Sequence, residues 1–191
     1  SFAGLVHRIA GDQWDGPGLG DWDLRSLVGH ASRSLITVST YLQTSADRED
    51  IATPQEYYAW TADYMSKAGA EAITERGRQA GRDLGPDPAA MVDELVERAL
   101  ADLETAGDPL IAVIDGLGLR LHTYLPTRTF ELAVHGLDIA RATGLSFNPG
   151  DDVLHEATTL AARIAVVTGR GDELLTALTG RSALPPGFSV V

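Results

Sequence analysis

TRTFELAVHGLDIARATG, residues 127–144, is the stretch of sequence that decides the fold. Pro126 suits the first turn of a helix and Gly144 suits its C-cap, so a helix is predicted over about residues 125–143. Polar residues recur in this helix every three or four positions and therefore share one side. They are Arg128, Glu131, His135 and Asp138. Apolar residues surround this stripe, and a buried polar stripe needs partners because unpaired charge in a core is costly.

The remainder of the chain also shows mostly helical patterns, separated by widely spaced turn signals. N-cap signals stand at Asp23, at the capping box Thr53-Pro54-Gln55-Glu56 and at Asp87-Pro88. Residues 110–124 are expected to be extended or irregular. Further helical segments are predicted at 2–9, 24–42, 54–82 with weak points at Gly69 and Gly77, 88–106, 151–167 capped by Asp151 or Asp152, and a short one capped by Asp172.

These patterns predict an all-α protein with one shared core. Several antiparallel helices of this length are typical of a four-helix bundle, here with added short helices. At 191 residues the chain is expected to form a single domain spanning residues 1–191.

Composition narrows the function classes. The chain has 27 acidic and 15 basic residues, a net charge of −12, so binding to a nucleic-acid backbone is not expected. No apolar run approaches the ~18 residues of a membrane span, and the first ten residues lack the pattern of a signal peptide. The absence of cysteine excludes disulfides, thiolate metal sites and a cysteine nucleophile, and it fits a cytoplasmic protein.

A metal site is one interpretation of the polar stripe. Glu131 and His135 lie one turn apart and can both ligate one ion, as in the metal sites of carboxylate bundles. His30 is the best candidate for a third ligand from a facing helix, because it borders the apolar face of its own helix. The alternative is a plain surface hydrogen bond between Glu131 and His135. His7 and His155 are expected to be solvated, and His122 to line a cleft or cap a chain end.

Two motifs resemble a known family. The segment GDWDLRSLVGH, residues 20–30, contains Trp-x7-His, and the stripe of residues 128–138 reads Arg-x2-Glu-x3-His-x2-Asp. Together with the closing LTGR of residues 178–181, they resemble the mycothiol-dependent maleylpyruvate isomerase family of DinB/YfiT-like metalloenzymes. The resemblance implies a four-helix bundle of up-down-down-up topology with a divalent metal, usually zinc. Its ligands fall on His30, Glu131 and His135.

The resemblance also implies a chemistry. Zinc lowers the pKa of a bound thiol, and a chain without cysteine would take that thiol from a cofactor such as mycothiol. The leading hypothesis is a metal-dependent, low-molecular-weight-thiol transferase or isomerase acting on a small electrophile. The alternative is a non-catalytic metal- or ligand-binding bundle or interaction module. Full isomerases carry a further C-terminal domain that contributes to the active site, and the chain is expected to end too soon after Gly144 to include it, which leaves maleylpyruvate isomerisation itself open. The substrate also stays open, and a homodimer is one of the expected oligomeric states.

Other polar residues have two interpretations each. Arg128 is a candidate to bind a carboxylate of substrate or thiol cofactor, or to pair with Glu131 or Asp138. Asp138 is a candidate to orient a ligand histidine or to cap a helix, and both residues are candidates for catalysis. Arg181 is a candidate to reach the substrate or cofactor, or to close the end of the bundle.

The aromatic residues are expected to be structural. Trp22 is read as an anchor for the loop that enters the His30 helix, or as ordinary core. A cluster of rings is spaced as the core side of the second long helix, with lining of a cleft as the less favoured role: Tyr57, Tyr58, Trp60 and Tyr64.

Overall fold

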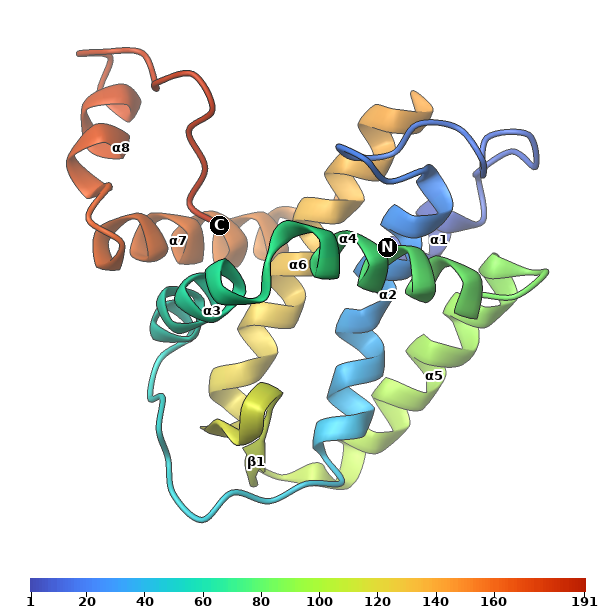
Figure 1. Cartoon of the computed structure of the whole chain (residues 1–191), viewed down its shortest axis with the longest axis horizontal. Helices are drawn as coiled ribbons and strands as arrows, with labels where there is room; N and C mark the ends of the chain where they lie inside the picture. Colours follow the sequence, from blue (N-terminus) through green and yellow to red (C-terminus); the bar gives the residue numbers. More distant parts are fainter.

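A computed structural model describes residues 1–191, apart from the side chains of Ala68 and Ala70, and it is mainly helical (Figure 1). The all-α fold class predicted from the sequence is confirmed. The elements are α1 Phe2–Val6, α2 Leu24–Tyr41, α3 Pro54–Ala68, α4 Ala70–Asp83, α5 Pro88–Ala106, β1 Leu110–Ala112, the 3-10 turn η1 Ile114–Gly116, β2 Gly118–Arg120, α6 Leu121–Thr143, α7 Asp151–Val167 and α8 Gly171–Leu178. Of the described helices, none has both the length and the apolar character needed to cross a membrane.

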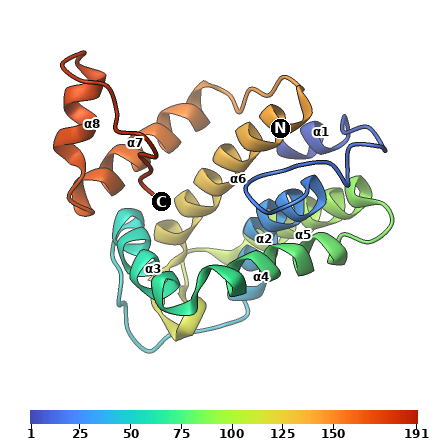
Figure 2. The ribbon, with the colours of Figure 1, turned by 45° about the horizontal axis from the view of Figure 1, so that its top comes forward.

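Helices α2 and α6 form the antiparallel pair that positions the site. Early in α2, the ring of His30 contacts that of His135, late in α6. Late in α2, the Thr37 hydroxyl accepts a hydrogen bond from Tyr124, early in α6. Figure 2 shows α6 running between α2 and α7, and α6 packs against both. The polar residues of α6 therefore face α2.

The second long helix is interrupted once. Gly69 has φ 83°, a left-handed value that glycine tolerates best, and it divides the predicted 54–82 helix into α3 and α4. Gly77, the other expected weak point, lies inside α4, where its missing side chain leaves room for the ring of Trp22. The break turns α4 across α2, and these two helices make an extensive contact.

The start of α6 differs from the prediction. The helix begins at Leu121 instead of about residue 125, and Pro126 lies inside it. Pro126 removes one backbone hydrogen bond of the second turn. Burial of Leu121 and Tyr124 (2% and 0% exposed) stabilises the preceding turn despite this loss. Before it, β1 and β2 pair antiparallel, in the segment predicted to be extended or irregular.

The caps of the last two helices also differ. Asp151 and Asp152 lie in the first turn of α7, whose N-cap is Gly150, and Asp172 lies in the first turn of α8, whose N-cap is Arg170. The predicted caps are wrong by one or two positions. Acidic side chains still favour these ends, because the first turn of a helix carries partial positive charge.

The buried apolar side chains form two clusters in place of the single core expected. One contains Val38 of α2 and Phe130 of α6, and the other contains Ala31 of α2 and Ile139 of α6. Both clusters therefore draw on the same two helices. On α6, Glu131 and His135 lie between Phe130 of one cluster and Ile139 of the other. Their polar groups need hydrogen-bonding partners instead of apolar neighbours.

Candidate metal centre

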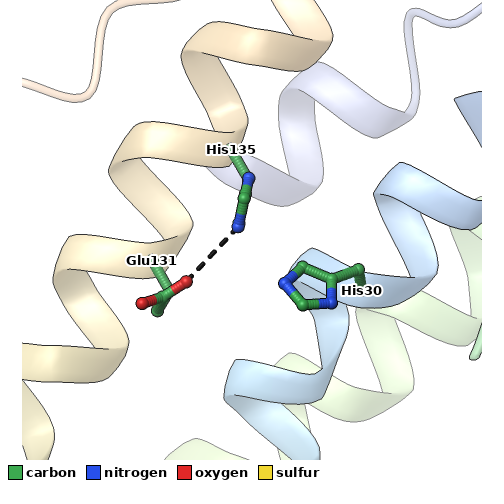
Figure 3. A group of neighbouring side chains, drawn as sticks. All are labelled: His30, Glu131 and His135. Carbon is green, nitrogen blue, oxygen red and sulfur yellow. Dashed lines mark ion pairs between the residues drawn. The ribbon is translucent and has the colours of Figure 1, made fainter. Parts of the chain in front are cut away.

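The structure brings His30, Glu131 and His135 together. One ligand atom from each residue lies within 4.8 Å of those of the other two. Figure 3 shows the three side chains converging, His30 from α2 and the other two from α6. The Asp23 carboxylate caps α2 by accepting from the Ser26 N–H, and one turn of helix later His30 faces α6.

The pair on α6 is held at ligand spacing. Nε2 of His135 lies 3.3 Å from Oε2 of Glu131. Two ligands bound ~2.0–2.2 Å from a tetrahedral zinc ion are about 3.4 Å apart, so this pair needs no rearrangement. His30 stands slightly further out, with its ring centroid 4.9 Å from that of His135 and nearly perpendicular to it.

The electrostatic states of two of the three residues suit a metal directly. Burial, with the nearby charge of His135, lowers the pKa of His30 to about 4, so its imidazole is neutral and free to ligate. Burial would raise the pKa of Glu131. The hydrogen bond from His135 and the charge of Arg128 outweigh that effect and lower the pKa to about 2. The site therefore offers one neutral imidazole and one carboxylate near neutral pH.

His135 carries the proton that an ion would replace. Burial lowers its pKa, but hydrogen bonds to Asp138 and Glu131 outweigh burial and raise the pKa to about 9. Its Nδ1 lies 3.2 Å from the Asp138 carboxylate, and its Nε2 faces Glu131. Asp138 thus fixes which nitrogen points into the site, as second carboxylates do for many zinc-bound histidines. The neutral and anionic N/O donors, with this support, fit a divalent metal ion.

A pocket of about 380 Å³ opens beside these ligands. A ligand site of ordinary size occupies ~300–1,000 Å³. Five residues of α2, between His30 and Tyr41, contribute to its wall, and α3, α4 and α6 supply most of the rest. Its aromatic and hydroxyl lining includes Trp22, Thr37, Tyr41, Tyr57, Tyr58, Thr61 and Tyr124. A small molecule can therefore reach the three candidate ligands.

Arginine side chains line the same pocket: Arg33 of α2, Arg76 of α4 and Arg128 of α6. The guanidinium of Arg128 lies over the rings of Tyr124 and Tyr57, 4.8 and 5.8 Å from their centroids, and its Nε donates to Thr127. Among the described residues, the ion pairs within 4.0 Å include none of these three arginines. In a chain of net charge −12, this concentration of positive charge marks a place for an anionic group.

The other predicted residues lie elsewhere or act differently. Arg181 follows α8, is exposed and donates to the Thr179 carbonyl oxygen, and the structure does not bring it to the pocket. His7 pairs with Asp93 and His122 pairs with Asp108, both on the surface, and His155 is exposed. Trp22 anchors the loop before α2 by donating from its indole nitrogen to the Thr74 carbonyl oxygen.

Sequence reasoning missed part of the lining. Tyr58 is buried, as expected of a core residue, but its hydroxyl also donates to Oε1 of Glu131 at 2.7 Å. Arg33 lies three residues after His30, a helical spacing that could have indicated a shared side. Arg76 comes from another helix, and no local pattern links it to the site.

The comparison with known families adds one finding. Residues 1–140 match the family described as mycothiol maleylpyruvate isomerase N-terminal domain. Neither the comparison with curated proteins nor that with solved structures gives a match. The matched region contains His30, Glu131, His135 and Asp138, and it ends before α7 and α8. The match covers most of the chain, which therefore belongs to the mycothiol maleylpyruvate isomerase N-terminal domain family.

Proposed function

We propose that this protein is a zinc-dependent enzyme that uses a low-molecular-weight thiol of the mycothiol type, as a transferase or isomerase acting on a small electrophile. The observation that carries the proposal is the convergence of His30, Glu131 and His135 beside a pocket of about 380 Å³. Three protein ligands leave a coordination position for an exogenous group, as in catalytic zinc sites.

The thiol has to come from outside the chain, because the sequence has no cysteine. A zinc ion held by the three residues would lower the pKa of a thiol bound in the remaining position. Neighbouring side chains hold the three candidate ligands in position before an ion or a thiol binds. Asp138 orients His135, Tyr58 contacts Glu131, and Trp22 lies against His30.

The arginines define the rest of the substrate. Arg33, Arg76 and Arg128 would neutralise an acidic group on the electrophile or on the thiol cofactor. Aromatic rings around Arg128 exclude water from it and strengthen its attraction for an anion. Of the two candidate catalytic residues, Arg128 would bind substrate, whereas Asp138 would act through His135.

A second candidate function is non-catalytic binding of a metal or small ligand. It is favoured by the residue types that line the pocket: the lining offers tyrosine and threonine hydroxyls, and among the described residues Glu131 supplies its one carboxylate side chain. A reaction that needs a separate general base would have to find it outside this lining.

The test uses untagged protein purified without chelator. We expect about one zinc ion per chain by elemental analysis, and His135→Ala should bind none tightly. In the cobalt-substituted protein, mycothiol should change the visible absorption spectrum, whereas S-methylated mycothiol, which lacks the free thiol, should not. Metal binding without any response to mycothiol would favour the non-catalytic alternative. A protein that binds neither zinc nor cobalt would contradict the zinc-dependent enzyme and leave only the binding of a small ligand.

A further inference from the structure

The two oxygens of the Glu131 carboxylate have different neighbours. Oε1 accepts a hydrogen bond of 2.7 Å from the hydroxyl of Tyr58, and Oε2 lies 3.3 Å from Nε2 of His135. The side chain of Glu131 is only 21% exposed, so water has limited access to replace either neighbour. The oxygen that faces the other two candidate ligands is therefore Oε2.

Tyr58 is itself held in place. Its ring packs edge-on against Phe130, 5.3 Å between centroids, and against Tyr57. Its hydroxyl also lies 3.1 Å from the carbonyl oxygen of Thr127, one turn before Glu131. A phenol has one proton to donate, and a carboxylate at the shorter distance accepts it more strongly than a neutral carbonyl does. The donor therefore points at Glu131 from a rigid, buried ring.

We propose that Tyr58 is a positioning residue that restricts Glu131 to binding a metal through one oxygen, Oε2. With Oε1 engaged by the phenol, the carboxylate cannot turn both oxygens toward the ion. Without that bond, both could bind, and the second oxygen would fill the position that a thiol needs. This inference rests on the proposed function, because it concerns the same ion, but it assigns a new role to a residue on α3.

The neighbouring tyrosine provides a matched control. Tyr57 precedes Tyr58 on α3 and has the same exposure, 7%, while the described hydrogen bonds of Glu131 do not include it. Tyr58→Phe and Tyr57→Phe each remove one hydroxyl from a largely buried side chain and keep the ring. Comparing the two variants separates the bond to Glu131 from a general effect of losing a hydroxyl in this cluster.

The experiment measures zinc affinity by competition with a chromophoric chelator and coordination number from the visible absorption of the cobalt form, which weakens as that number rises. Tyr58→Phe should weaken zinc binding by about 10–100-fold, the usual effect of removing a group that orients a ligand. Its cobalt absorption should also weaken. Tyr57→Phe should leave both measurements at the wild-type values.

Contrary outcomes are distinguishable. If wild-type protein binds neither metal, the proposed function fails, and the role of Tyr58 fails with it. If wild-type protein binds zinc and Tyr58→Phe matches it in affinity and cobalt spectrum, only the role of Tyr58 is overturned. If Tyr58→Phe does not fold, the inference can still be tested in the wild-type protein. Its zinc form should show a slowly exchanging hydroxyl proton of Tyr58 by NMR, and the absence of that signal would overturn the inference.

Discussion

The ring of Trp22 lies against the ring of His30, with centroids 4.5 Å apart and planes inclined by 34°. Trp22 is fixed from two other directions. Its indole nitrogen donates to the Thr74 carbonyl oxygen, and its ring edge fills the space beside Gly77. Contacts with α4 therefore hold the indole against His30, the candidate ligand on α2.

This contact predicts an optical signal for metal binding. Cobalt bound at His30 should quench the fluorescence of Trp22, because the two rings touch. Trp22→Phe should lose most of the quenching, whereas Trp60→Phe, which alters a ring stacked on Tyr64, should keep it. The measurement is a cobalt titration followed by fluorescence, with binding checked separately by chelator competition. Equal quenching in both variants would contradict binding at His30.

Gly77→Ala should disturb the centre from a distance. A Cβ at this position would lie 2.4 Å from the indole of Trp22, so the ring has to move toward His30 or away from α4. Overpacking of this kind costs about 1–3 kcal/mol, more than the gain of alanine over glycine within a helix. We expect lower stability in chemical denaturation and weaker zinc binding. Gly11→Ala, whose Cβ would meet no atom within 4 Å, is the control and should change neither.

His135→Ala should abolish tight zinc binding and leave the helical fold intact. Two remaining ligands rarely hold zinc against water, but a bundle of this size does not need an ion to fold. Circular dichroism of the metal-free variant should match that of the metal-free wild type. Zinc at a hundredfold excess over its dissociation constant should stabilise the wild type by about 2.7 kcal/mol and the variant by much less. His155→Ala, on the exposed side of α7, should respond as the wild type does.

Acid should weaken the start of α6 through Asp108. Its carboxylate accepts hydrogen bonds from the backbone N–H and the ring of His122, and these bonds hold the pKa of Asp108 below the usual 3.8. A lowered pKa means that the stabilisation is present above pH 3.8 and is lost as the pH falls through the folded-state value. The stability advantage of wild type over Asp108→Asn should therefore shrink on acidification below pH 3.8. Denaturation curves from pH 6 to pH 2 check this, and a constant difference would contradict it.

The sequence was most informative where its signals are local. The cap at Asp23 and the spacing of Glu131 and His135 depend on residues within one or two turns, and both features are present in the structure. His30 emerged as a partner because it borders an apolar helix face. The break at Gly69 was one of two expected weak points; the other, Gly77, is helical, and the ring of Trp22 packs against it.

The remaining features depend on contacts between distant segments. Tyr58 donates a hydrogen bond to Glu131, although the two residues are 73 positions apart in the sequence. The sequence pattern around Tyr58 is equally typical of an ordinary core residue. Arg76 approaches the pocket because Gly69 turns α4 across α2, an angle that no local pattern specifies. The division of the buried apolar residues into two clusters likewise follows from how α2 and α6 align.

The separation of the buried apolar residues into two clusters affects where α2 and α6 separate first during local unfolding. Each cluster can exclude water by itself, whereas at the level between them the rings of His30 and His135 meet across α2 and α6, next to the carboxylate of Glu131. Amide hydrogens of α6 at that level are expected to exchange with solvent sooner than those beside Phe130 or Ile139, because polar side chains interrupt the apolar packing there. A bound ion would join α2 to α6 at the level between the two clusters, so metal loss should loosen the contact of these helices there before either cluster unfolds.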